Sequence, residues 1–521
     1  MSYQRACRAL WLGLLLTACR SDGPAPSAMT ADDEQDSDSD TGTTGEDEGP
    51  PPVLVTHSFG SLALKASSDT QRCVQWTVNN DQHLYVQSVL LANSGALHHS
   101  NWYVVPEEEF PGEDGYFPCD DRNFNDIGAA LKGTVLFAQS TQSFTDEQRF
   151  TPGAVVKVPA RHKVMATVHT VNAAPQAMET ELRMSFELTH PADVHTVVAP
   201  ISAQYRELAL PPASRSSVTT RCDWKASYYG TIGALPSFKI HYVLPHYHYL
   251  GERFEVKVIG GAHDGEIIYS LDGFNGGANG RTYDPPLELP GATGFEFTCG
   301  YNNWTDKTVT WGNGKGEMCV MFILGESEAM LGGTVLGDSE VVGVDDGVVR
   351  FEAPCFEIAQ PKSPWQGMPT ADEINAPLYV PPIEPSDQGL PPIPPCVDTD
   401  PSATPTRPAT LSDVAASIFA PSCTFSSCHG ELAAAGLDLD QSGAALHAEL
   451  LGHDVVASTG LPLIAPGDPE GSWLYRLLSR CEPVDDAGNP VAHMPRNAPF
   501  LLDEGLVATL RAWIEAGAPD N

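Results

Sequence analysis

Short runs of alternating apolar and polar residues, broken by Pro, Gly and Asn, fill most of residues 57–360. Examples are Ala154–Val158, Lys163–His169 and Phe254–Ile259. A period of two places successive side chains on opposite faces of a strand, and frequent turn residues favour antiparallel pairing. The stretch is too long for one sandwich, so we expect two antiparallel β-sandwiches, at 57–200 and 201–360.

Two flanking stretches have compositions that cannot build a core. Between Ser21 and Leu64 there are ten acidic residues and no Lys or Arg, which predicts a disordered acidic tether at 20–56. Residues 361–410 contain 14 prolines, which predicts an extended Pro-rich linker without a packed core of its own.

Helical patterns rich in Ala follow this linker, in residues 411–521. In the last of them Leu506, Leu510 and Trp513 share one helical face, as expected for a helix docked on a core. We therefore expect a small, compact all-α domain at 411–521.

The N-terminus predicts export. Arg5 and Arg8 precede the apolar run Ala9–Ala18, which is about half as long as a membrane-spanning helix and is typical of a signal peptide. The run ends in Leu16-Thr17-Ala18-Cys19, which resembles the bacterial lipobox. Residues 1–19 are therefore expected to be a lipoprotein signal, with Cys19 lipidated and the protein anchored to a bacterial membrane, in the periplasm or at the cell surface. The alternative is an ordinary secretory signal in which Cys19 occurs by chance.

Charge excludes one class of partner. The chain has 29 Lys plus Arg against 67 Asp plus Glu, a formal net charge of -38. Such a surface repels phosphate backbones, so no nucleic-acid partner is expected.

Ten cysteines remain besides Cys7 in the signal and Cys19. An even number in an exported protein indicates disulfides. Six of them precede the Pro-rich linker and four lie within or after it, so each part of the chain is able to pair its own set.

Histidine spacing points to a metal. His246 and His248 are two residues apart, which puts both imidazoles on one face of a strand. His98 and His99 are adjacent and would face opposite ways, so joint ligation requires a bulge or a loop. His169 ends an alternating run. Taken alone, histidines in each of these patterns are more often ordinary core or surface residues than metal ligands.

Met318, in the segment Gly316-Glu-Met318-Cys319, distinguishes between metals. A thioether is a soft ligand that favours Cu(I) and is not a usual zinc ligand. One alternative is that Met318 is a core residue of a strand. A second alternative is zinc at the three histidines of the first sandwich.

The order of these motifs resembles the type II copper, ascorbate-dependent monooxygenases, the family of peptidylglycine α-hydroxylating monooxygenase and dopamine β-monooxygenase, over about residues 60–358. The resemblance implies two jelly-roll-like sandwich domains that each hold one copper ion. It implies an electron-transfer site of His98, His99 and His169, and a catalytic O2 site of His246, His248 and Met318. It also implies the disulfides Cys73–Cys119, Cys222–Cys355 and Cys299–Cys319.

The implied activity is hydroxylation of a C–H bond in a small organic substrate by O2, which needs two external electrons. In the peptide-amidating branch of the family, an Arg, an Asn and a Tyr hold the substrate carboxylate. The matching positions here are Leu244, Val320 and Phe322, which cannot bind a carboxylate. Glycine-extended peptides are therefore not expected, and an apolar or aromatic substrate fits this lining better.

The chain after the linker contains Cys423, Cys428 and His429, with four residues between the cysteines where haem c attachment usually has two. With His493-Met494-Pro495 and the terminal helix, this segment resembles a bacterial single-haem cytochrome c domain. The resemblance implies haem c bound through Cys423 and Cys428, with His429 and Met494 as iron ligands. His493 is an alternative distal ligand.

A further alternative is a cytochrome-like fold without haem, in which Cys423 and Cys428 form a disulfide. If haem occupies those two cysteines, Cys396 and Cys481 remain to pair with each other.

Together these features predict a lipid-anchored copper monooxygenase that receives electrons from a fused cytochrome c domain or an external donor. The alternatives are a non-catalytic surface lipoprotein that binds copper or haem or shuttles electrons, and a structural or adhesive protein with empty sites.

Overall fold

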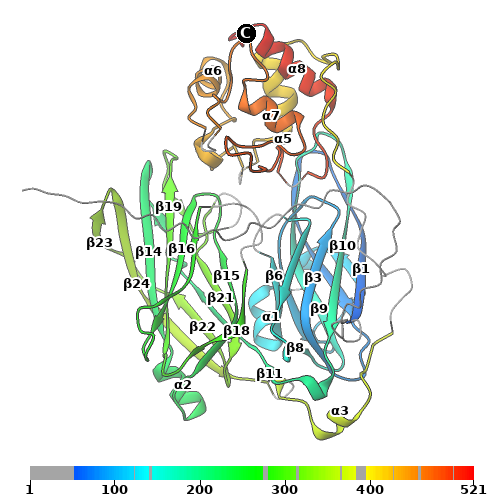
Figure 1. Ribbon diagram of the computed structural model, residues 1–521, viewed down its shortest axis with the longest axis vertical. Helices are drawn as coiled ribbons and strands as arrows, with labels where there is room; N and C mark the ends of the chain where they lie inside the picture. The colour runs from blue at the N-terminus through cyan, green and yellow to red at the C-terminus, as the bar shows by residue number, and fades with distance from the viewer. Residues whose placement is uncertain are drawn as a thin grey trace, which may run out of the picture. The chain divides into compact units, whose positions relative to one another are not determined.

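A computed structural model describes most of the chain after residue 51 (Figure 1). The predicted signal peptide, Cys19 and nearly all of the acidic tether lie outside the described residues. Within the described part, no helix has both the length and the apolar character needed to span a bilayer. The described ranges are 52–122, 124–139, 143–273, 280–312, 316–363, 366–382, 395–425, 428–455, 459–496 and 498–521.

The first β region consists of a six-stranded and a five-stranded sheet. The six-stranded sheet has the order β1-β10-β3-β8-β11, with β7 paired to β3, and the five-stranded sheet has the order β5-β2-β9-β4-β6. The strands are β1 (Val53–Leu64), β2 (Ser68–Thr77), β3 (Leu84–Asn93), β4 (Leu97–Pro106), β5 (Gly115–Phe117), β6 (Thr134–Gln139), β7 (Thr145–Arg149), β8 (Ala154–Val158), β9 (His162–Asn172), β10 (Met178–Leu188) and β11 (Thr196–Val197).

One apolar core lies between these two sheets. Trp102 of β4 and Phe186 of β10 come from different sheets and belong to the same buried cluster. Two sheets that share a core in this way are compatible with the predicted β-sandwich. The strand β1 begins at Val53, four residues before the predicted start of the sandwich, because Val53–Thr56 pair with β10.

The second β region is built on one large curled sheet of eleven strands (Figure 1). Its order is β17-β16-β19-β14-β24-β22-β12-β21-β15-β18, with β23 paired to β24, and a separate pair joins β13 and β20. The strands are β12 (Ala199–Gln204), β13 (Ala209–Leu210), β14 (Ser214–Asp223), β15 (Phe238–His246), β16 (Gly251–Ile259), β17 (Ile267–Asp272), β18 (Arg281–Leu289), β19 (Gly294–Asn303), β20 (Val309–Thr310), β21 (Val320–Glu326), β22 (Ala329–Val335), β23 (Glu340–Asp345) and β24 (Val348–Pro361).

The chain passes from the first region to the second close to the predicted boundary. β11 pairs with β8 of the first region, whereas β12 pairs with β21 and β22 of the second. The curled sheet encloses its own core, in which Trp224, Phe295 and Phe297 are fully buried. Short helices flank the sheets: α1 (Asp126–Lys132), α2 (Lys225–Ile232), η1 (Cys119–Arg122) and η2 (Pro191–Asp193).

Four apolar residues of the second region are buried together with the core of the first. They are Tyr242, Leu244, Phe322 and Leu324, on β15 and β21. Beside them, Thr151 Oγ1 lies 3.1 Å from His241 Nδ1, and His241 Nε2 lies 3.0 Å from Glu326 Oε1. The two β regions are thus joined by a shared apolar contact and a buried polar one.

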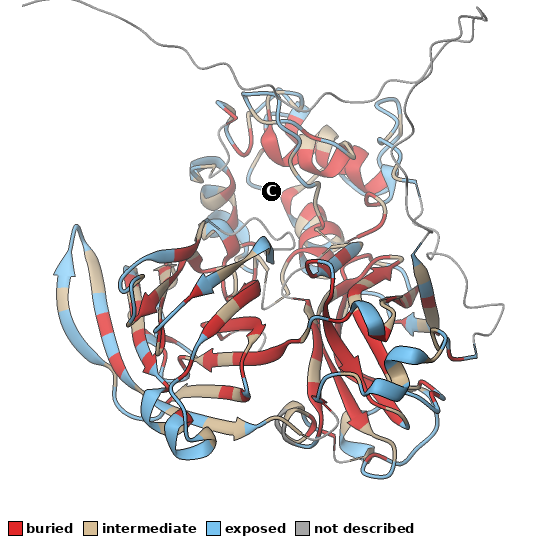
Figure 2. Ribbon diagram, turned by 60° about the horizontal axis from the view of Figure 1, so that its bottom comes forward, coloured by how far each residue is buried: buried red, intermediate tan, exposed pale blue. Residues whose placement is uncertain are grey.

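The described chain after Thr410 contains short helices joined by irregular segments. Its elements are α4 (Leu411–Val414), η5 (Ala415–Phe419), α5 (Ala420–Ser422), η6 (Ala434–Gly436), α6 (Gly443–Gly452), α7 (Trp473–Ser479) and α8 (Glu504–Glu515). The predicted terminal helix is confirmed, with Leu506, Leu510 and Trp513 buried. Figure 2 shows burial concentrated along the strands and these helices, while the β23–β24 hairpin is largely exposed.

The expectation that residues 361–410 form an extended spacer is wrong where the chain docks on its neighbours, in 370–379 and 399–406, and residues 383–394 lie outside the described residues. Helix α3 (Ala371–Asn375) begins with a capping box at Thr370, and Glu373 accepts a hydrogen bond from the Tyr85 hydroxyl. Leu378 and Tyr379 pack against the first core. Further along, Thr399 and Thr406 donate backbone hydrogen bonds to the helical part of the chain. A Pro-rich composition weakens an independent core, but it does not prevent docking on neighbouring ones.

The structure has the three disulfides implied by the family resemblance, Cys73–Cys119, Cys222–Cys355 and Cys299–Cys319, and a fourth that joins Cys396 to Cys481. All four pairs are those expected from the sequence. Disulfides persist in oxidising compartments, so they indicate a protein that is exported or resides in such a compartment.

Candidate metal centre

His98, His99 and His169 converge on β4 and β9 of the five-stranded sheet. Their potential ligand atoms all lie within 4.8 Å of one another. The β4–β9 register shifts between Leu97 and His99, and His99 pairs directly with His169. This irregularity at His98 is the bulge that two adjacent ligands were expected to require, and it turns both imidazoles toward His169.

The tautomer of His169 follows from its two neighbours. Its Nε2 lies 2.5 Å from Asp69 Oδ1, and its Nδ1 lies 3.2 Å from His99 Nε2. A carboxylate accepts hydrogen bonds, so Nε2 of His169 carries the proton and Nδ1 is the ligand atom. Two nitrogens about 2.0 Å from one tetrahedral ion lie about 3.3 Å apart, close to the separation of these two nitrogens.

His246 and His248 lie next to each other, with ring centroids 5.1 Å apart. The sequence predicts that both stand on one strand face, but β15 ends at His246 and His248 belongs to the turn that follows. Nδ1 of His248 lies 2.8 Å from the carbonyl oxygen of Gly316, which leaves Nε2 as its ligand atom.

Hydrogen bonds to Glu317 link the Met318 segment to the turn that contains His248. The carboxylate of Glu317, fully buried, accepts backbone hydrogen bonds from His248 and Leu250, both at 2.8 Å, and from Met318 at 3.2 Å. The Tyr301 hydroxyl donates to the Met318 carbonyl at 2.6 Å. These bonds fix the Met318 backbone beside His248, and Met318 itself is half-buried.

The two histidine groups touch. The ring of His99 lies 5.9 Å from that of His246, centroid to centroid, in an edge-on arrangement. The histidines of the two groups are brought together by the shared contact between the β regions. Four of the five are half-buried and His169 is buried, so a metal held here would have a shielded side and a side open to solvent.

The electrostatics of the cluster favour neutral imidazoles, which are the form that binds metal. Burial lowers the pKa of His98 and His99 well below the ordinary histidine value, and the neighbouring imidazoles of both groups lower it further. Burial also lowers the pKa of His248, against the opposing effect of its hydrogen bond to Gly316. Burial raises the pKa of Glu317 to about 8, although three backbone amides favour its charged form.

Two of the three positions expected to line an apolar substrate site are core residues. Leu244 and Phe322 are buried in the cluster shared with the first β region. Only Val320 retains partial exposure. The contact between the two regions therefore covers Leu244 and Phe322, and the expectation of an apolar substrate stays a prediction.

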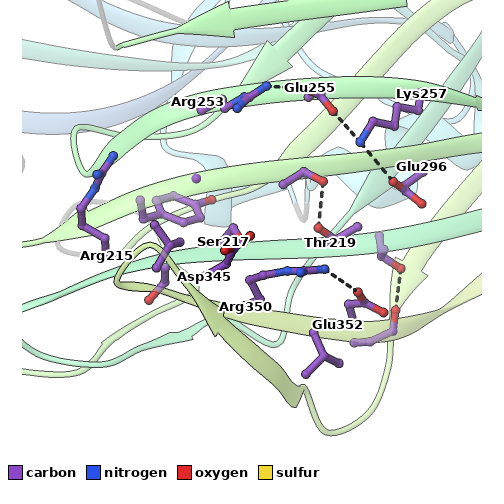
Figure 3. Close-up of a pocket in the computed structure, with 18 of the residues that line it drawn as sticks. Arg215, Ser217, Thr219, Arg253, Glu255, Lys257, Glu296, Asp345, Arg350 and Glu352 are labelled. Atoms are coloured by element: carbon purple, nitrogen blue, oxygen red, sulfur yellow. Dashed lines mark hydrogen bonds and ion pairs between the residues drawn. The ribbon is translucent and has the colours of Figure 1, made fainter. Parts of the chain in front are cut away.

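A hollow of about 1160 Å³ lies away from the histidines, on the outer face of β14, β16, β19 and β24 (Figure 3). Its cations are paired with carboxylates, as in Arg221–Glu296 and Lys257–Glu255. Ion pairs of this kind on an exposed sheet face contribute little stability.

The expected haem ligands lie in the helical part of the chain. His429 Nδ1 lies 3.0 Å from the carbonyl oxygen of Ala434, which fixes the tautomer and leaves Nε2 as the ligand atom. Burial lowers the pKa of His429 and raises that of the Cys423 thiol to about 12. Cys423 is buried and Cys428 is half-buried, and neither belongs to the four disulfides. The structure therefore does not contain the alternative disulfide between Cys423 and Cys428.

The distal side of the haem site has two candidates. Met494 is partly buried against the apolar cluster of the helical part. Nδ1 of His493 is buried without a hydrogen-bond partner among the described residues, and burial lowers the pKa of this imidazole. A neutral histidine with an unsatisfied ring nitrogen is a suitable iron ligand, so His493 and Met494 are both candidates for the distal position.

Asp69 and Glu317 were not assigned a role from the sequence. Asp69 lies 100 residues before His169, and no local spacing connects them. Glu317 is part of the segment that identified Met318, so its place directly before a candidate ligand was the signal available.

No known protein family matches this sequence, and no curated protein is significantly similar to it. Weak structural similarity is found to the major capsid protein P2 of bacteriophage PM2, with 6% identity over 53% of this chain and 98% of that one and a TM-score of 0.24. The PBSX exported protein XepA gives 12% identity over 52% and 86%, with a TM-score of 0.15. These scores are too low to indicate a shared fold.

Proposed function

We propose that this protein is a copper-dependent monooxygenase that hydroxylates a C–H bond of a small organic substrate with O2. The observation that carries the proposal is the convergence of His98, His99 and His169 beside His246 and His248. The family resemblance assigns a soft thioether, Met318, to the second group, and hydrogen bonds to the buried Glu317 link the Met318 backbone to that of His248.

His98, His99 and His169 would hold one copper ion, and His246, His248 and Met318 the other. Copper, when bound, supplies the one-electron chemistry that O2 reduction requires. The protein's own contribution is orientation. Asp69 holds the proton of His169 on Nε2, and the Gly316 carbonyl holds that of His248 on Nδ1, so each ring presents one defined nitrogen.

The overall reaction combines the substrate R–H, O2, two electrons and two protons to give R–OH and water. The two electrons come from a one-electron donor, used twice. We assign this role to a haem c bound by Cys423, Cys428 and His429, or to an external reductant. Leu432, four residues after Cys428, is buried in the core of the second β region and accepts a hydrogen bond from Trp304 Nε1 at 2.8 Å, which supports the fused donor.

The proposal includes anchoring of the exported protein to a bacterial membrane through lipidated Cys19. The four disulfides support export. The anchor rests on the lipobox resemblance and is tested by mass spectrometry of the mature N-terminus.

Incorporation of labelled oxygen tests the activity. Copper-loaded protein is given a one-electron donor, ¹⁸O2 and a panel of small aromatic and aliphatic C–H compounds. We expect one ¹⁸O atom in a hydroxylated product, two electrons consumed per product, and loss of product in His246→Ala. His263→Ala, at a half-buried histidine paired with Glu266 away from the cluster, is the matched control. Reduction of O2 by the copper-loaded protein without ¹⁸O in any compound of the panel would contradict the proposal.

That contradicting result would favour a second function, copper binding or electron transfer without oxygenation. The burial of Leu244 and Phe322 is the observation in its favour, because a substrate has no access to those two positions.

A further inference from the structure

We propose that the helical part of the chain, 411–521, passes the electrons of its haem to the second ligand set through Trp304. The inference rests on the function proposed above, because it requires copper at His246, His248 and Met318 and haem c at His429. It goes beyond that function because it assigns the ligand set that accepts electrons from the haem and the residues through which they reach it.

Leu432 docks the helical part on the second β region. Its side chain is 1% exposed and belongs to the core of that region, although Leu432 is only three residues from the proposed iron ligand His429. Its carbonyl accepts a hydrogen bond from Trp304 Nε1 at 2.8 Å, and Trp304 packs against the same core. Beside this bond, Lys307 Nζ lies 3.9 Å from Glu431 Oε1. The loop that docks is therefore the loop that follows the proposed iron ligand.

A hydrogen bond connects His429 to this loop. Nδ1 of His429 lies 3.0 Å from the carbonyl oxygen of Ala434, and Leu432 and Gly436 are two residues before and after Ala434. An added Cβ at Gly436 would lie 3.9 Å from Trp304 Cγ, so the chain on both sides of Ala434 contacts the indole. Covalent bonds and two hydrogen bonds thus connect the imidazole of His429 to Trp304.

On its other side, Trp304 is connected to Met318. Tyr301 lies on β19, three residues before Trp304, and is 1% exposed. Its hydroxyl donates to the Met318 carbonyl at 2.6 Å. The thioether of Met318 is a proposed ligand of the second set, so the path ends in that side chain. Electrons tunnel more readily through covalent and hydrogen bonds than across van der Waals gaps, and this path contains only the first two.

A second contact of the helical part offers a rival route to the first set. Gly95, three residues before His98, has a φ of +117°, and an added Cβ there would lie 2.8 Å from Pro499 Cδ. The Gly95 amide donates to Asn93 and its carbonyl accepts from Thr180, so Gly95 meets Pro499 through van der Waals contact. Because that route includes a through-space step, we assign the second set as the acceptor.

The transfer is a one-electron step. Fe(II) of the haem becomes Fe(III) and Cu(II) of the second set becomes Cu(I), without a bond being formed or broken. An external one-electron reductant returns the haem to Fe(II), so the same step is available for the next electron.

Flash reduction of the haem in full-length, Cu(II)-loaded protein without O2 tests the assigned acceptor. A photoreductant supplies the electron, and absorbance follows reoxidation of the haem. His169→Ala disables the first set and His248→Ala the second. We expect reoxidation to persist in His169→Ala and to be lost in His248→Ala. The opposite pattern, or equal rates in the two variants, would overturn the route.

Trp304→Phe tests the path itself, because it keeps an aromatic ring and removes the Nε1 donor. We expect reoxidation at least about two-fold slower than in wild type, with the Cu(I) affinity of the second set unchanged. Trp224→Phe removes a matched bond, from Nε1 to the Gly332 carbonyl at 2.9 Å, elsewhere in the same β region and is the control. A wild-type rate in Trp304→Phe would exclude Trp304 from the route.

Hydrogen exchange of the full-length protein before loading tests the docking without either cofactor. Leu432→Ala removes the anchoring side chain, so we expect faster backbone exchange in residues 304–311 than in wild type. Leu451→Ala, at an exposed leucine of α6, is the control. Unchanged exchange in Leu432→Ala would overturn the docking and the route with it.

These failures are distinguishable from failure of the proposed function. Incorporation of ¹⁸O with an external reductant, in protein whose haem does not reduce the second set, would overturn the route and leave the proposed monooxygenase standing.

Discussion

The carboxylate of Asp69 accepts a hydrogen bond from His169 across the β2–β9 pair, with Oδ1 2.5 Å from Nε2. Because this bond holds the proton on Nε2, it directs Nδ1 toward His99. Asp69 is therefore a positioning residue that acts through His169 without contacting the metal itself.

Asp69→Asn tests this role. The amide is a weaker acceptor than the carboxylate and can turn its NH2 group toward the ring, so we expect copper affinity at one of the two sites to fall about 10- to 100-fold. Competition with a Cu(I) chelator measures the affinity, and X-ray absorption reports the number of imidazole ligands. Asp193→Asn, at an exposed position of η2, is the control. Unchanged copper binding in Asp69→Asn would exclude the positioning role.

Met318→Ala tests the assignment of the soft ligand. We expect one Cu(I) site to weaken and the other to remain near full occupancy, because the thioether contributes to one ligand set only. Cu(I) titration of wild type and variant measures both sites. Met368→Ala removes an exposed methionine and serves as the control. Equal loss at both sites, or no loss, would remove Met318 from the ligands.

The haem assignment predicts covalent attachment. In protein exported with cytochrome maturation machinery, we expect the haem to remain attached after acidic acetone extraction. In Cys428→Ser we expect less haem to remain attached after the same extraction. Absorption spectra before and after extraction make the measurement. The Met494→Ala and His493→Ala variants identify the distal ligand through the spectrum of the oxidised haem. Colourless protein from such an expression would rule out the cytochrome interpretation.

The buried contact of His241 predicts a pH dependence of stability. Burial lowers the pKa of His241 in the folded state, so between that value and about 6.5 the unfolded chain binds a proton that the folded one does not. The free energy of unfolding should therefore fall as pH decreases below about 6.5. His241→Gln should flatten this dependence, measured by urea unfolding of wild type and variant at pH 5 and pH 7.5. An equal slope in wild type and His241→Gln would refute the assignment.

Local sequence patterns were sufficient to predict several elements. Alternation identified β8 from Ala154 to Val158 with its true bounds, and the apolar face of Leu506, Leu510 and Trp513 identified α8. For His98 and His99 the sequence indicated that a bulge or a loop is needed if both side chains reach one ion, and the structure has a bulge there. Each of these inferences depends on residues close together in the chain.

Contacts between distant segments were not predictable in the same way. The Asp69–His169 bond depends on the β2–β9 register, and the His99–His246 contact depends on how the two β regions meet. Leu378 and Tyr379 pack on the core of the first β region, which was not predicted. The composition of a segment shows whether it can form a core of its own, but not whether it packs on a neighbouring one.

Copper content after loading is the measurement that tests the central claim most directly. The protein is incubated with excess Cu(I) and Zn²⁺ together, passed through a desalting column, and analysed for both metals. The ligand sets, three imidazoles in one and two imidazoles with a thioether in the other, predict two copper ions per chain and no retained zinc. A protein that retains zinc in place of copper, or no metal at all, would contradict the account.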